Sequence, residues 1–191
     1  MKYELYMADC ETTGLDFNKH SPVEISIYRM STGEQRTWYL KPINTSEIDA
    51  AALKVNGLKA EDLCGFTKEG REKFKDPSGI LCDIENWLAE DNMPTQQRLL
   101  VGHNVGFDKQ MLISLWEKCN SRDLFPFSDK YSLDTMMMQF MLDHAKGEHA
   151  EGYSLKACLK RYSIKNDNAH EAAADVRATV ELFNKLITML K

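Results

Sequence analysis

The sequence lacks three features that would assign it to a specialised class of protein. Its five cysteines, among 191 residues, are scattered and lack the paired short spacings of a disulfide framework or a zinc site. It has no apolar run near the roughly 18 residues that a membrane-spanning helix needs. It also has no excess of positive charge, because its formal net charge is −5. We therefore expect a cytoplasmic protein without a membrane contact, which does not coat nucleic acid by charge alone.

The pattern of apolar residues predicts strands first and helices later. Alternating segments at 3–8, 23–30 and 35–40 are separated by turn-forming residues and predict an antiparallel meander. A short apolar strand near 98–104 then leads into a helix, and a long amphipathic helix covers 170–190. We expect no leader segment before the first strand, and the sequence shows no internal repeat. We therefore expect one α/β domain over residues 1–191 with a sheet of mixed direction.

A charged segment around 65–79 stands out because it has no apolar period. We expect it to be a surface loop or flap inserted into the domain. Its four basic residues allow two interpretations, either a solvated loop or a guide for a nucleic-acid strand. These residues are Lys68, Arg71, Lys73 and Lys75.

Two carboxylates stand one residue apart at the end of the first predicted strand. Asp9 and Glu11 point to the same face of that strand, about 7 Å apart, because strand side chains alternate. A D-x-E triplet arises by chance about once in a chain of this length. Its position carries more information, because two buried carboxylates on one face either bind a metal ion or repel each other.

A third carboxylate, Asp108, follows the strand near 98–104 and falls in the first turn of the next helix. An aspartate there complements the helix dipole and needs no function. Its neighbours favour a site, since Asn104 is a polar side chain at the junction of strand and helix, and Phe107 places a large ring beside the charge.

The last pair is His170 and Asp175, in the segment HEAAADVRAT. Five residues turn a helix by about 500°, so these side chains converge only if His170 lies in the loop or frayed first turn before the helix. Asn168 and Glu171 have the spacing of a capping box, which favours a helix start here. A histidine at a helix start is commonly a cap or a surface residue, whereas beside an acidic cluster it is a candidate general base.

The ordered set D-x-E, H-N-x-x-F-D and H-x-x-x-x-D resembles the three motifs of the DnaQ-like, DEDDh group of 3′→5′ exonucleases. The resemblance extends over essentially the whole chain, including KPINTSEIDAAALKVNGLKAEDL, YSLDTMMM and SLKACLKRYSI. It implies an α/β, ribonuclease H-like three-layer fold. Such a fold has a mixed five-stranded sheet with three antiparallel N-terminal strands and helices on both faces.

The resemblance also implies two Mg²⁺ or Mn²⁺ ions, which oxygen ligands suit. By this resemblance, Asp9, Glu11 and Asp175 would hold one ion, and Asp9 and Asp108 the other, while His170 would take a proton from water. The family's substrate contacts correspond to five further residues. These are Thr12, Thr13, Leu15, Asn104 and Phe107.

Three functions remain open, and the first is preferred. In the first, the chain releases nucleoside 5′-monophosphates from the 3′ end of single-stranded or frayed DNA, as in repair or proofreading. In the second, it acts on short RNA and RNA 3′ ends. In the third, it is a catalytically silent binding module. The last motif lacks the glycine that follows the histidine in bacterial proofreading subunits. The chain also ends at Lys191 without a tail, so we expect no polymerase partner.

Overall fold

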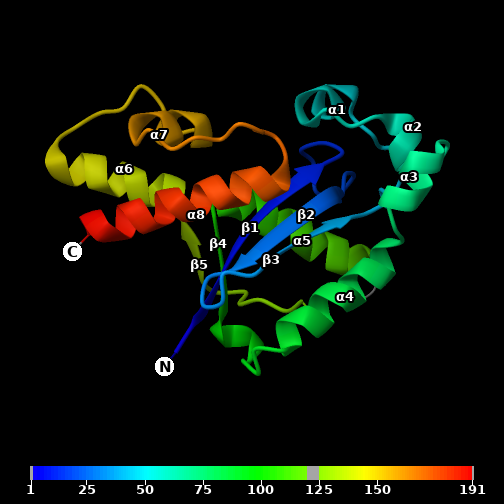
Figure 1. The fold of residues 1–191 in the computed structure, drawn as a ribbon, viewed down its shortest axis with the longest axis horizontal. Helices are drawn as coiled ribbons and strands as arrows, with labels where there is room; N and C mark the ends of the chain where they lie inside the picture. The colour runs from blue at the N-terminus through cyan, green and yellow to red at the C-terminus, as the bar shows by residue number, and fades with distance from the viewer. Residues whose placement is uncertain (1, 120–124, 191) are drawn as a thin grey trace.

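The computed structural model describes residues 2–119 and 125–190, and it contains a five-stranded sheet with the order β3-β2-β1-β4-β5 (Figure 1). β2 pairs antiparallel with β1 and β3, whereas β4 pairs parallel with β1 and β5. The strands are β1 (Glu4–Thr12), β2 (Pro22–Arg29), β3 (Gln35–Tyr39), β4 (Arg98–Gly102) and β5 (Ser132–Asp134). This arrangement confirms the predicted mixed sheet with an antiparallel N-terminal meander.

Helices cover both faces of the sheet (Figure 1). The helices are α1 (Ala50–Asn56), α2 (Ala60–Leu63), α3 (Lys68–Lys73), α4 (Pro77–Ala89), the 3₁₀ helix η1 (Thr95–Gln97), α5 (Val105–Lys118), α6 (Thr135–Lys146), α7 (Leu155–Arg161) and α8 (Ala172–Met189). None of the helices in the described part of the chain is long and apolar enough to cross a membrane.

The alternation of β1 divides the core into two parts. Tyr6 and Ala8 are buried in a cluster with α4 and α5, whereas Met7 is buried in a second cluster with α8. Because successive strand side chains point to opposite faces, Asp9 and Glu11 share the face of Met7 and point toward α8. The sheet therefore directs both carboxylates to the side on which the last helix lies.

The structure corrects two expectations. β1 extends to Thr12, well past the predicted end at residue 8, because it stays paired with β2 as far as Thr12. The segment 65–79 is not a loop, since it contains α3 and the start of α4. Phe74 is buried in a cluster with α1 and α2. Packing against the rest of the molecule therefore stabilises regular structure in a segment whose charged sequence does not indicate it.

Candidate active site

The first two carboxylates lie inside β1 and not beyond its end. Asp9 faces Ser26 across the antiparallel pair, and Glu11 faces Glu24. The ladder thus fixes the backbone on which both side chains stand. A carboxylate opposite a carboxylate is unfavourable in a sheet, so Glu11 and Glu24 form a pair whose repulsion another group must offset.

Asp108 reaches the same place from α5. The chain turns at Asn104, which has the left-handed conformation with φ of 61°, and α5 starts at the next residue with Asp108 in its first turn. The parallel pairing of β4 with β1 ends before Cys10, whose N–H donates instead to Asp108 Oδ1 at 2.9 Å. Asp108 therefore satisfies a backbone group of β1 and is held next to Asp9.

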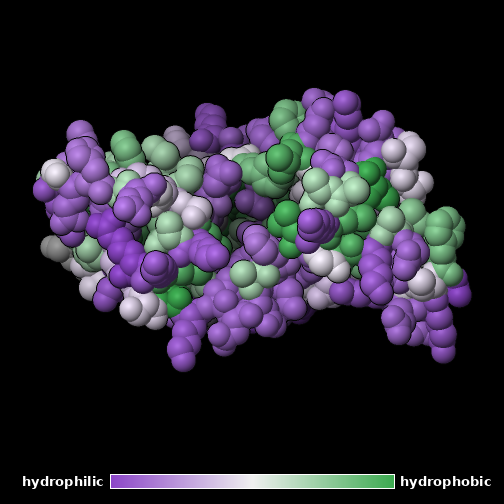
Figure 2. Space-filling model, turned by 90° about the horizontal axis from the view of Figure 1, so that it is seen from above, coloured by the Kyte–Doolittle hydropathy of each residue, from purple (hydrophilic) through white to green (hydrophobic). Residues whose placement is uncertain are grey.

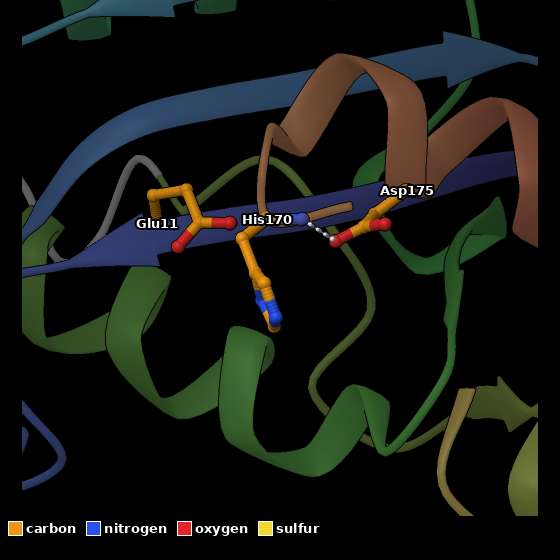
Figure 3. A group of neighbouring side chains, drawn as sticks. All are labelled: Glu11, His170 and Asp175. Carbon is orange, nitrogen blue, oxygen red and sulfur yellow. Dashed lines mark hydrogen bonds between the residues drawn. The ribbon is translucent and has the colours of Figure 1, made fainter. Parts of the chain in front are cut away.

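His170 and Asp175 come from the start of α8. The helix begins at Ala172 with Glu171 as its N-cap, so the predicted capping box between Asn168 and Glu171 does not form. His170 lies before the helix in the left-handed conformation with φ of 70°, as convergence with Asp175 requires. Its backbone N–H donates to Asp175 Oδ2 at 3.1 Å, which binds the lead-in to the first turn (Figure 3).

These elements bring the predicted residues into one cluster. One possible ligand atom from each of Glu11, His170 and Asp175 lies within 4.8 Å of the other two. Figure 3 shows these three side chains on β1 and at the start of α8. Asp9 interacts by charge with Asp108, Asp175 and Glu11. Glu11, His170 and Asp175 therefore lie together, and Asp9 and Asp108 lie near enough to interact with them by charge, although Asp9 and Asp175 are 166 positions apart in the chain.

The cluster is strongly acidic. Burial, followed by the charges of Asp108, Asp175, Glu11 and Glu24, raises the pKa of Asp9 well above its ordinary value. Burial and neighbouring carboxylates raise the pKa of Glu11 to about 8. Burial also raises the pKa of Asp108 to about 7, even though the N–H of Cys10 favours its charged form.

This donor set fits hard divalent cations. The largest charges that act on Asp9 are those of the carboxylates Asp108, Asp175, Glu11 and Glu24. Mg²⁺ and Mn²⁺ prefer such oxygen ligands, and a bound cation reverses the electrostatic penalty that the carboxylates otherwise suffer. Asp9, Glu11, Asp108 and Asp175 are therefore suited to hold metal ions.

Sequence reasoning missed two residues of this site. Asn166 donates from its side-chain amide to Asp175 Oδ1, and nothing in the local sequence indicates that contact. Glu24 is only 5% exposed. Burial raises its pKa, while Lys73 and the backbone N–H groups of Ala173 and Ala172 act in the opposite direction. A glutamate within an otherwise largely apolar strand was the available signal for Glu24.

A mostly apolar hollow of about 290 Å³ adjoins the carboxylates. It is lined by Cys10, Glu11, Thr12, Leu15, Asp49, Ala51, Ala52, Val55, Asn56 and Phe107. Three of the five predicted substrate contacts, Thr12, Leu15 and Phe107, thus surround the same space. Seen from above, apolar surface gathers to one side of a central hollow in the molecule (Figure 2).

The other two predicted contacts lie elsewhere in the same region. Thr13 is buried, and its hydroxyl accepts a hydrogen bond from Ser21 N at 3.2 Å, so it shapes the turn after β1. Asn104 is exposed at the start of α5, where its N–H donates to Asp134 Oδ1 at 3.0 Å. Neither residue is part of the lining of the hollow.

Comparison with known proteins agrees with this geometry. Residues 7–183 match the model of the RNase T family, which is described as exonuclease. The chain belongs to this exonuclease family. The match extends from β1 to α8 and therefore includes every carboxylate of the cluster.

Individual relatives are distant but similar over nearly the whole chain. A PolC-type DNA polymerase III from Latilactobacillus sakei is 28% identical over 96% of this chain, which spans only 11% of that polymerase. Ribonuclease T from Haemophilus ducreyi is 24% identical over 96% of this chain and 84% of its own length. The chain thus corresponds to a small part of one relative and to most of the other.

Solved structures show the same fold. The E. coli Exonuclease I complex with single-stranded DNA, in a zinc-bound form, has a TM-score of 0.75 at 20% identity, covering 100% of this chain and 41% of that one. E. coli Exonuclease I with a dT13 oligonucleotide has a TM-score of 0.74 at 19% identity, covering 97% of this chain and 41% of that one. The ribonuclease H-like fold expected from the sequence is therefore confirmed.

Proposed function

We propose that this protein is a metal-dependent 3′→5′ exonuclease that releases nucleoside 5′-monophosphates from single-stranded or frayed DNA ends. The observation that carries the proposal is the convergence of four carboxylates and His170 beside an apolar hollow. Membership of the exonuclease family supports the reaction class. The single-stranded DNA bound by the structural neighbours supports the choice of DNA.

The acidic residues have defined roles in this proposal. Asp9, Glu11 and Asp175 hold one divalent ion, and Asp9 and Asp108 hold a second. Such ions, when bound, supply the positive charge that favours a water nucleophile and the departing 3′ oxygen. Asp108 also keeps its place on β1 through the N–H of Cys10, so the same hydrogen bond sets the spacing between Asp9 and Asp108.

His170 is the general base of the proposal. It is exposed and lies on the lead-in to α8, so its imidazole is accessible to water at the reacting phosphate. A neutral imidazole accepts the proton of that water, and surrounding carboxylates stabilise the imidazolium that results. The hydrogen bond from the His170 backbone to Asp175 keeps the ring near the metal ligands.

The hollow would hold the terminal nucleotide. Leu15 and Phe107 offer apolar contact or stacking to a base, and Thr12 and Glu11 line the same hollow. This arrangement would place the last phosphodiester against the carboxylates. A chain end, rather than an internal bond, suits such a site, because one small hollow accepts one unpaired base.

RNA is the second candidate substrate. The similarity to Ribonuclease T from Haemophilus ducreyi favours RNA, because this chain spans 84% of that protein. By contrast, this chain spans 41% of the structural neighbours that contain DNA. The two substrates differ at the 2′-OH, so discrimination depends on the room for that group beside the sugar. The silent binding module keeps the fold but would not bind divalent ions productively.

A degradation assay decides among these functions. Oligonucleotides of DNA and RNA with the same sequence, labelled at the 5′ end, are incubated with and without Mg²⁺ or Mn²⁺. We expect a ladder of products shortened from the 3′ end, faster on single-stranded DNA. Asp9→Asn should abolish the ladder, and His170→Gln should lower kcat by about a hundredfold or more. The lack of shortening of either substrate by the wild type would refute the exonuclease proposal.

A further inference from the structure

The turn between β1 and β2, residues 13–21, is held by contacts of its own and by contacts from α5. It carries Leu15 to the edge of the hollow, where the side chain stays 77% exposed. An exposed leucine contributes almost nothing to burial, so the hydrophobic effect does not place it there. Polar contacts must therefore determine where Leu15 stands.

Some of these contacts lie within the turn. The hydroxyl of Thr12 donates to the carbonyl of Gly14 at 2.8 Å, and the N–H of Asp16 donates to His20 Nδ1 at 3.0 Å. The ring of His20 packs so closely on Gly14 that a Cβ at this position would come within 2.5 Å of it. The turn therefore closes around the imidazole and leaves Leu15 at its outer edge.

The remaining contacts come from the far end of α5. The ammonium of Lys118 donates to the carbonyls of Phe17 at 2.8 Å and His20 at 2.6 Å, and Ser114 Oγ also donates to the carbonyl of Phe17. Burial lowers the pKa of Lys118, as expected for an ammonium partly removed from water. One cation thus bridges two backbone carbonyls that stand on either side of the tip of the turn.

We propose that Lys118 is a positioning residue for substrate binding, which holds the turn 13–21 in the shape that presents Leu15 to the terminal nucleotide. The inference rests on the proposed function, because the hollow must take a nucleotide. Lys118 lies outside the family motifs and does not line the hollow, so it extends the set of residues that the proposed function requires. The same helix then serves the site twice, through Asp108 in its first turn and Lys118 in its last.

Steady-state kinetics on a single-stranded DNA oligonucleotide tests the inference. Lys118→Met keeps the length of the side chain but removes the ammonium. We expect KM to rise about tenfold while kcat stays within about twofold, because the change removes binding and not chemistry. Lys118→Arg keeps a cation that can bridge the two carbonyls and should restore most of the affinity.

Lys109→Met is the matched control. Lys109 lies on the same helix, and its ammonium also donates to one backbone carbonyl, that of Asp129 at 2.8 Å. We expect this variant to lose stability without the rise in KM. Leu15→Ala, at an exposed position, should raise KM by itself, and adding Lys118→Met to it should change KM little, because both act through one contact.

A second measurement does not depend on activity. The N–H groups of Lys19 and His20 both donate to the carbonyl of Asp16, at 3.0 and 2.7 Å, so their hydrogen exchange reports on the turn. We expect faster exchange in Lys118→Met than in Lys109→Met. Unchanged exchange, or an unchanged KM in an active protein, would overturn the role of Lys118. A wild-type protein without nuclease activity overturns the proposed function and this inference with it.

Discussion

At the scale of single residues, the site holds several negative charges close together, which is unfavourable for the folded state. Asp108 is buried and Asp9 is half-buried, and the largest charges that act on Asp9 are those of other carboxylates. A protein retains such a cluster only if its benefit arises elsewhere, and in the proposed function divalent cations provide it. Removing one of these charges should therefore raise the stability of the metal-free protein and lower its nuclease activity.

Asp9→Asn tests this conflict. In the presence of a chelator at pH 8, we expect the variant to melt above the wild type, by about 3 °C for each kcal/mol of repulsion removed. With Mg²⁺ the order should reverse, since the wild type gains stability from the ion and the variant gains less. Differential scanning calorimetry measures both. Asp83→Asn, at an exposed position of α4, is the control and should change neither value; a variant less stable than the wild type without metal would contradict the prediction.

At the scale of elements, tertiary contacts decide what the charged segment 65–79 becomes. Gly70 is buried in α3, and a Cβ there would lie 2.2 Å from the carbonyl oxygen of Asp62 at α2. The close approach of these two short helices therefore depends on the absence of a side chain. Gly79 in α4 has open space around it instead.

The two glycines form a matched pair for substitution. Gly70→Ala should destabilise the protein by about 1–3 kcal/mol, because α2 and α3 must separate to make room. Gly79→Ala should stabilise it by about 0.5–1 kcal/mol, because alanine loses less conformational entropy in a helix. Urea denaturation of both variants measures the two effects. Equal effects would show that the contact between α2 and α3 does not matter.

At the scale of the whole molecule, stability should depend on pH in two windows of opposite sign. Glu11 and Asp108 have folded pKa values of about 8 and about 7, above their ordinary values. Between about pH 4 and 8 the folded state therefore binds more protons than the unfolded state. It follows that the metal-free protein loses stability as the pH rises through this window.

Denaturant unfolding in the presence of a chelator measures the first window. We expect a larger free energy of unfolding at about pH 5.5 than at about pH 8, and we expect Mg²⁺ to remove most of the difference by binding the charged carboxylates at pH 8. Equal stability at the two pH values without metal would contradict the electrostatic account of the site.

The second window concerns Asp91, which joins the end of α4 to β1 and β4. It accepts hydrogen bonds from Arg98, at 2.9 and 2.7 Å, and from the hydroxyl of Tyr6 at 2.6 Å. Burial alone raises its pKa, but the bonds from Arg98 and Tyr6 outweigh burial and leave the pKa low. This contribution is present above the unfolded pKa of about 3.9 and disappears as the pH falls through the folded pKa.

Asp91→Asn should consequently be costly at neutral pH and nearly harmless in acid. We expect a loss of about 3 kcal/mol at pH 7, because Arg98 remains buried without its charge partner. The loss should shrink steadily toward about pH 2, where the wild-type carboxyl is protonated as well. Thermal melts across this range measure the trend, and a loss independent of pH would indicate a packing defect instead.

The sequence by itself determined the kinds of elements and the chemistry of the site. Periodicity predicted the meander, the mixed sheet and the long last helix. A strand or helix that buries one face has apolar residues at regular intervals, and these intervals can be read directly from the sequence. The order of Asp9, Glu11, Asp108, His170 and Asp175 indicated the family, since metal ligands need particular side chains. Their catalytic roles stay predictions that the degradation assay will test.

Only the tertiary structure decided which other residues join them. Glu24 enters the site through strand register, Asn166 through the fold of the lead-in to α8, and Lys118 through the packing of α5 against a turn about a hundred positions away, as its contacts with Phe17 and His20 indicate. The helix in the segment 65–79 likewise depends on the burial of Phe74. These contacts join residues that are distant in sequence, and no local pattern encodes a distance between two parts of a chain.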